Sequence, residues 1–262
     1  MGMKIAVLIS GQPRFSNDFN MLLSNLKNYD RLDFFFYLWN SAPSESHWIP
    51  PTWPMEYNQI RSRILKNLSL KCNIADLKVL SQPEYQVTRE YNLTPWSNPV
   101  NIWYNFHGTN QVNLLREEYE KENGNYDLVI KSRPDVGLAA PIDCVSVKKF
   151  LDNNPSTVIM PNNHRFGMAG RTVIMPNNLK AGAAGRAVTD LLGFGLGPTM
   201  SVYCRAVNYL DQYNDQGALY HGESLLAWHL TANNILSPNT NFNCTFREDW
   251  YKYNKVNFGN WL

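Results

Sequence analysis

Two cations and a carboxylate follow an apolar run in the middle of the chain. Lys131, Arg133 and Asp135 occupy alternate positions in the segment NYDLVIKSRPDVGL, residues 125–138. A carboxylate at the end of a strand can hold a hard cation such as Mg²⁺ or Mn²⁺, which in turn binds a diphosphate. Neighbouring cations neutralise further phosphate charge. The cluster therefore suits a metal-diphosphate, and the alternative is an Arg–Asp surface ion pair worth about 0–1 kcal/mol.

A second candidate segment comes directly after the first apolar run of the chain. It consists of Ser10, Gly11, Gln12, Pro13 and Arg14. The glycine lets the backbone approach a ligand, and Arg14 is suited to hold a phosphate in a forked contact. A tight strand-to-helix turn needs similar residues for structural reasons alone. Because the segment is neither G-x-G-x-x-G nor G-x-x-x-x-G-K-[ST], the sequence disfavours a nicotinamide-dinucleotide site and a P-loop.

Alternating strand and helix patterns surround both segments. Apolar runs predict strands at residues 4–10, 31–40, 77–80 and 126–132, and helical spacing predicts helices at 16–28, near 60–68, at 101–123, from about 199 and from about 222. Residues 41–55 and 81–100 are predicted loops. This order indicates an α/β fold with a mostly parallel sheet flanked by helices. Since ligands bind beyond the carboxyl ends of such strands, both segments belong at that edge.

A local duplication interrupts the alternation. TVIMPNNHRFGMAGR at residues 157–171 is followed at once by TVIMPNNLKAGAAGR at residues 172–186. Repeat architectures need about three or more units to bury a continuous core, and this chain has two copies. We interpret the segment as a duplication and assign no chemistry to it.

Composition excludes several classes of protein. The chain has 262 residues with a net charge of +2, and no basic block that would favour nucleic acid as a partner. Its four cysteines, Cys72, Cys144, Cys204 and Cys244, have no C-x-x-C spacing and resemble scattered reduced thiols. No apolar run approaches 18 residues, so no transmembrane segment is expected. We therefore expect a cytoplasmic protein.

Four segments in order carry a resemblance to a known family. They are KIAVLISGQPRF, YDLVIKSRPDV, VTDLLGFGLGPTMSVY and HGESLLAWHL. Together they resemble small bacterial and viral sugar transferases with a GT-A-type, Rossmann-like nucleotide-sugar-binding domain. The resemblance implies transfer of a sugar from a nucleotide-diphosphate donor to a hydroxyl of a glycan or lipopolysaccharide-like acceptor. It also implies one domain over residues 1–262, with nucleotide binding at about 1–140 and acceptor binding at about 141–262.

The resemblance assigns roles to particular residues. A D-x-D motif usually binds Mn²⁺ or Mg²⁺ in such enzymes, and here Arg133-Pro134-Asp135 stands in its place, so the expected metal ligand is Asp135 alone. Lys131 and Arg133 then carry part of the electrostatic stabilisation. The turn Ser10, Gly11, Gln12 and Arg14 is expected against the nucleotide.

Two carboxylates in the second half of the chain are candidate catalytic residues. Asp190 matches an acid that precedes an aromatic-glycine turn in the family, where it can bind sugar hydroxyls; the alternative is an ordinary turn or N-cap aspartate. Glu223 opens a predicted helix and can act as general base towards the acceptor hydroxyl. The alternative for Glu223 is a stabilising acid at a helix N-terminus.

Two other functions compete with the transferase. The incomplete D-x-D keeps open a non-catalytic nucleotide- or carbohydrate-binding protein on the same scaffold, since a fold does not fix a function. A nucleotidyltransferase is the third candidate function. It is disfavoured because the first turn has one glycine and no lysine.

Overall fold

The structure is a computed structural model of the chain. It describes residues 2–13, 17–40, 57–69, 71–94, 97–161, 188, 190–238 and 244–246. Several segments singled out in the sequence fall outside these ranges, namely Arg14, the whole loop at 41–55, and the duplication beyond residue 161. Within the described residues, no helix is both long and apolar enough to cross a membrane.

A five-stranded, mostly parallel sheet forms the centre of the protein. Its strands are β1 (Lys4–Gly11), β3 (Arg31–Trp39), β4 (Cys72–Leu80), β5 (Leu128–Ser132) and β8 (Gly193–Gly195), in the order β4-β3-β1-β5-β8. The first four are parallel, and β8 pairs antiparallel with β5. The prediction of a mostly parallel sheet is therefore confirmed, whereas the antiparallel edge strand was not foreseen.

Two small sheets and a set of helices surround the centre. The small sheets pair β2 (Leu26–Lys27) with β7 (Ile142–Asp143) and β6 (Val136–Leu138) with β9 (Cys244–Phe246). The helices are α1 (Asn17–Asn25), α2 (Tyr57–Asn67), α3 (Pro99–Asn123), α4 (Cys144–Asn153), α5 (Gly197–Cys204), α6 (Leu210–Asp215) and α7 (Gly222–Ala232), with the 3-10 helix η2 (Arg205–Tyr209) between α5 and α6. Helices thus flank the sheet, as predicted.

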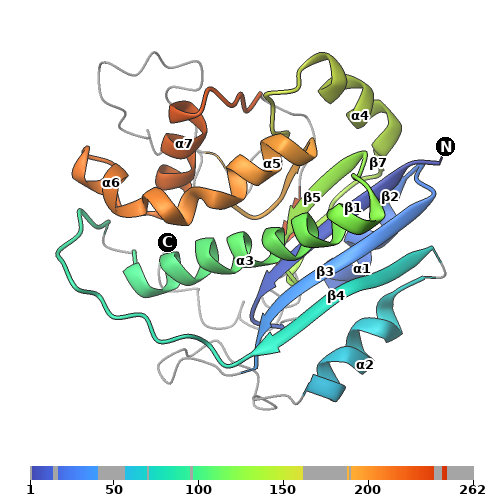
Figure 1. Ribbon diagram of the computed structural model, residues 1–262, viewed down its shortest axis with the longest axis horizontal. Helices are drawn as coiled ribbons and strands as arrows, with labels where there is room; N and C mark the ends of the chain where they lie inside the picture. Colours follow the sequence, from blue (N-terminus) through green and yellow to red (C-terminus); the bar gives the residue numbers. More distant parts are fainter. Residues whose placement is uncertain are drawn as a thin grey trace, which may run out of the picture.

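The central strands are buried on both faces, and side chains alternate between two hydrophobic cores. In β1, Ala6 and Leu8 pack into the core that holds α3, α5, α6 and α7, while Val7 and Ile9 pack into the core of α1, α2 and α4. Such double burial explains why parallel strands read as continuous apolar runs. Figure 1 shows α3 lying across one face of the sheet, with α5 and α7 beyond it.

The long helix α3 ends at Asn123, as its sequence predicts, and begins at Pro99, two residues before the predicted start at residue 101. The side chain of Asn98 accepts hydrogen bonds from the backbone of Val100 and Asn101, and Pro99 occupies the first turn, where its missing N–H costs nothing. The helix ends at Gly124, which adopts a positive φ of 75°. These signals fix the helix that later carries residues of the candidate site.

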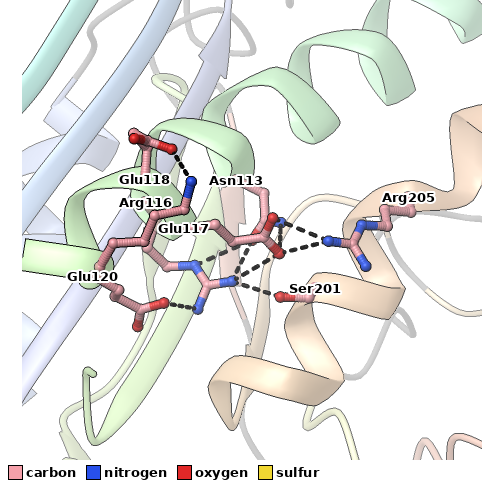
Figure 2. Close-up of polar contacts among 8 residues, drawn as sticks. Asn113, Arg116, Glu117, Glu118, Glu120, Ser201 and Arg205 are labelled. Carbon is pink, nitrogen blue, oxygen red and sulfur yellow. Dashed lines mark hydrogen bonds and ion pairs between the residues drawn. The ribbon is translucent and has the colours of Figure 1, made fainter. Parts of the chain in front are cut away.

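A buried arginine joins α3 to α5. Figure 2 shows Arg116 at the centre of a polar network, and its side chain is only 1% exposed. Its guanidinium donates to Glu120 at 2.9 Å, to Asn113 at 2.9 and 3.2 Å and to Ser201 of α5 at 2.7 Å. Because every side of this cation meets an acceptor, its burial is tolerated. The network fixes α5, and with it the end of β8, against α3.

Candidate active site at the carboxyl edge of the sheet

The sheet brings the two sequence-predicted segments to one edge. β1 and β5 are neighbours and run parallel, with Ile9 paired to Ser132. Gly11 therefore lies two residues beyond this pair, and Arg133 lies one residue beyond it on the next strand. The proximity expected from the strand-end rule is present at the level of the backbone.

Within the first segment, the residues differ in what they can offer to a ligand. Gly11 has a φ of +113°, and an added Cβ would meet nothing within 4 Å, so the backbone conformation rather than crowding requires glycine. Ser10 is only 5% exposed and faces Gly108 of α3, whose added Cβ would come within 3.3 Å of it. Gln12 is partly buried, and Arg14 lies outside the described residues. Of this segment, Gly11 and Gln12 remain the candidates for contact with a ligand.

Lys131 is a buried cation beneath this edge. Its side chain points, like that of Val129, to the face covered by α3, and the residue is 1% exposed. The ammonium group donates to the backbone carbonyl of Asp190. Burial lowers the pKa of Lys131 to about 8, although the nearby carboxylate of Asp190 opposes the shift. The group is therefore mostly protonated at pH 7 and places a positive charge under the loop that carries Asp190.

Arg133 and Asp135 form a forked ion pair. Nε and Nη2 of Arg133 lie 3.0 and 2.9 Å from the two carboxylate oxygens of Asp135. The Asp135 residue is 3% exposed, while the Arg133 side chain is 23% exposed. The pair is thus buried on its acidic side, which differs from the surface ion pair considered as the alternative. Solvent therefore reaches the pair from its arginine side.

Asp135 does not have the surroundings of a metal ligand. Both of its carboxylate oxygens already accept from Arg133. Among the residues that the structure describes, no group of three or more His, Cys, Asp or Glu side chains is arranged to hold a metal ion. Mg²⁺ and Mn²⁺ prefer several oxygen ligands. The donor set found here does not fit a resident divalent cation, so the metal assigned to Asp135 stays a prediction.

Asp190 lies where β5, α3 and α7 meet. Nδ2 of Asn105, from α3, donates to its Oδ2, and Lys131 donates to its backbone carbonyl. A Cβ added to Gly222, the first residue of α7, would lie 3.4 Å from the same Oδ2. Asp190 was named as a candidate from the sequence, and its partner Asn105 was not. In the sequence, Asn105 is one polar residue among the apolar positions of 101–123. That pattern does not indicate a partner 85 residues away.

Glu223 lies in the first turn of α7, next to Gly222, and the helix begins where the sequence predicts. Its side chain is 16% exposed, and its carboxylate lies 4.0 Å from Nδ1 of His221, whose side chain is 20% exposed. His221 is the N-cap residue, and its side chain makes no capping hydrogen bond. A partly exposed carboxylate beside an imidazole is suited to accept a proton from a hydroxyl group. Asp190 therefore lies beside Gly222, the residue that precedes Glu223, at the N-terminal end of α7.

No protein-family model matches the chain, and a search of curated proteins finds no significant match.

Proposed function

We propose that the chain is a glycosyltransferase with a GT-A-type domain. The reaction moves a sugar from a nucleotide-diphosphate sugar to an acceptor hydroxyl on a glycan or lipopolysaccharide-like molecule. The observation that carries the proposal is the meeting of the Gly11 turn, the Arg133–Asp135 pair and Asp190 at the carboxyl edge of the sheet. Open α/β sheets bind their ligands at this edge.

Cations at the site suit the leaving group of such a reaction. When the bond between the sugar carbon and the diphosphate breaks, negative charge develops on the diphosphate, and fixed positive charges stabilise it. Arg133 presents a partly exposed guanidinium, which binds phosphate in a forked manner. Lys131 adds a second positive charge, which acts through the protein because its buried ammonium donates to the Asp190 carbonyl and does not reach the surface.

Carboxylates of the site suit the acceptor side of the reaction. Glu223 is assigned as general base: it takes the proton of the acceptor hydroxyl while the new bond forms between that oxygen and the sugar carbon. Asp190 is assigned to hydrogen bonds with sugar hydroxyls. None of these steps depends on Mn²⁺ or Mg²⁺, which the donor set around Asp135 does not fit.

Release of nucleoside diphosphate from UDP- and GDP-sugars tests the proposal. We expect slow release even without an acceptor, with water in its place.

Glu223→Gln should reduce acceptor-dependent transfer by about 100- to 10,000-fold, the range for loss of general base catalysis. Asp135→Asn should abolish activity because it weakens the pair that holds Arg133. Glu122→Gln, an exposed acid near the end of α3, is the control that should retain full activity. Absence of release with every donor contradicts the enzyme assignment.

A non-catalytic nucleotide- or carbohydrate-binding protein is the second candidate. The forked ion pair favours it, because Arg133 occupies the acid that would otherwise bind a metal. Such a protein is stabilised by nucleotide against heat and releases no product. Turnover by the wild-type protein separates the two functions.

A further inference from the structure

Asp190 is held by two different groups from two different elements. Lys131 of β5 binds its backbone carbonyl, and Asn105 of α3 binds its carboxylate. Among the described residues, the hydrogen bond to the carboxylate is made through Oδ2. The opposite oxygen, Oδ1, is the one that this arrangement leaves for another donor.

Asn105 is itself firmly placed in the fold. The hydroxyl of Thr109, one turn further along α3, donates to its backbone carbonyl at 2.8 Å, and Thr109 is 2% exposed. Gly108 allows the same stretch of helix to approach Ser10 of β1 and Trp39 of β3, with its hypothetical Cβ 3.3 and 3.5 Å from them. The amide of Asn105 is thus presented from a helix packed directly on the sheet.

An aspartate fixed in this way differs from one in an ordinary turn. Lys131 limits the movement of its backbone, and Asn105 limits the rotation of its carboxylate. An acceptor that is already oriented loses little freedom when a ligand hydroxyl binds to it. Support from rigid elements is what a binding group needs if it is to discriminate between ligands.

We propose that Asn105 is a positioning residue that orients the Asp190 carboxylate towards a hydroxyl of the donor sugar. The inference rests on the proposed function. It assigns Asn105 and Asp190 to recognition of the sugar and not of the nucleotide. Asn105 acts through Asp190 and touches no reacting atom. Loss of its N–H donor should therefore weaken recognition of the sugar and leave the nucleoside diphosphate unaffected.

Comparative binding and kinetics of Asn105→Leu and the wild-type protein test the inference. Calorimetry with a UDP- or GDP-sugar and with the matching nucleoside diphosphate gives the ratio of the two dissociation constants. We expect Asn105→Leu to weaken sugar-nucleotide binding by about 10- to 100-fold, as for a hydrogen bond to a charged group. The affinity for nucleoside diphosphate should change by less than about twofold, because this ligand lacks the sugar that Asp190 binds. General damage to the fold would instead weaken the binding of both ligands equally.

Three further variants complete the experiment. Asn105→Asp keeps the size of the side chain, removes the donor and adds a negative charge beside Asp190. It should therefore weaken sugar-nucleotide binding at least as much, even if Asn105→Leu folds poorly. Asn105→Gln retains the amide and should recover part of the affinity. Asn101→Leu makes the same exchange at an exposed position one turn earlier in α3 and should behave as wild type.

The outcomes separate this inference from the proposed function. Equal weakening of both ligands, or an unchanged ratio of dissociation constants in Asn105→Leu and Asn105→Asp, overturns the positioning role while the enzyme assignment stands. A wild-type protein that binds a sugar nucleotide without turnover, and loses that preference in Asn105→Leu, supports the inference and rejects the enzyme. A wild-type protein that binds neither ligand overturns both.

Discussion

Lys131 has the most unusual electrostatic position of the candidate residues. Its ammonium group is enclosed between the sheet and α3, and burial lowers its pKa from 10.5 to about 8. Folding therefore costs about 3 kcal/mol at neutral pH through this group, at about 1.4 kcal/mol per pKa unit. Retaining such a charge is consistent with a role in binding an anion, because a methionine of similar length would pack there without the cost.

The shift in the pKa of Lys131 predicts a dependence of stability on pH. Between pH 8 and 10.5 the unfolded chain holds a proton that the folded chain has released, so the free energy of unfolding rises with pH across this window. Urea denaturation at pH 7.5, 8.5 and 9.5 measures the rise. Lys131→Met should remove it and be more stable at pH 7.5 by a few kcal/mol at most.

An exposed lysine provides the control for this experiment. Lys149 of α4 is exposed, and Lys149→Met should keep the wild-type slope. An identical slope in wild type and Lys131→Met would show that the Lys131 ammonium is not titrating in that range.

Among the elements, α3 connects the site to the second half of the chain. Its Arg116 network binds Ser201 of α5 (Figure 2). Gly197 at the start of α5 allows the close approach, since an added Cβ would lie 3.0 Å from the guanidinium. The aromatic rings of Trp103 and Tyr85 stack with centroids 4.5 Å apart, which attaches the segment 81–94 to the same helix. Helix α3 thus determines where Asn105 and its neighbours lie.

We predict that Arg116→Met strongly destabilises the protein. The substitution leaves Oδ1 of Asn113 and Oε2 of Glu120 without their donor in a largely buried setting, and breaking a buried pair in this way costs about 3–5 kcal/mol. Lys121→Met is the matched control on the same helix. Its partner Glu118 is exposed, so the change should stay within about 0.5 kcal/mol. Chemical denaturation measures both, and equal effects of the two substitutions would contradict the assignment of Arg116 to a buried network.

Helices α5, α6 and α7 are joined by another buried side chain. His229 of α7 is fully buried, with Nε2 2.7 Å from the carbonyl of Val202 and Nδ1 2.8 Å from the hydroxyl of Tyr213. Because a carbonyl only accepts, Nε2 carries the proton and Nδ1 accepts from the tyrosine. Burial lowers the pKa of His229 below its ordinary value of 6.5.

The neutral state of His229 predicts a loss of stability in acid. The unfolded chain gains a proton as pH falls through 6.5, and the folded chain does so only at lower pH, so the free energy of unfolding falls over that interval. His229→Gln should be less stable at pH 7.5 and show a smaller decrease between pH 7 and 5. Burial also lowers the pKa of His107, and His107→Gln measures that separate contribution. An unchanged decrease in His229→Gln would assign the effect elsewhere.

Sequence patterns predicted the elements whose burial is continuous. β1, β3 and β5 are apolar runs because both of their faces are covered, and α3 has an N-cap asparagine and a terminal glycine. β8 is three residues long, Gly193–Gly195, and depends on pairing with β5 rather than on local propensity, so the same residues looked like a turn. The Asn105–Asp190 contact spans 85 residues and carries no local signal. Tertiary contacts determine both the strand β8 and the Asn105–Asp190 hydrogen bond, so local sequence patterns do not predict them.

At the scale of the whole molecule, the site joins parts of the chain that are distant in sequence. The Gly11 turn comes from β1, Arg133 follows β5, Asp190 precedes β8, and Glu223 lies in the first turn of α7. A ligand that contacts these groups binds the folded state and not the unfolded chain. Its binding free energy is therefore added to the stability of the entire fold.

Thermal denaturation with UDP, GDP and their sugars is the measurement that follows from this coupling. At a free ligand concentration of 100 times the dissociation constant, the stabilisation is about 2.7 kcal/mol, which for a chain of this size raises Tm by about 5–10 °C. The corresponding nucleosides lack the diphosphate and should give little change. Mn²⁺ should not enlarge the shift, because both carboxylate oxygens of Asp135 already accept from Arg133. An equal Tm with diphosphates and nucleosides would contradict a diphosphate site at this edge, because Arg133 and Lys131 would then have no anion to stabilise.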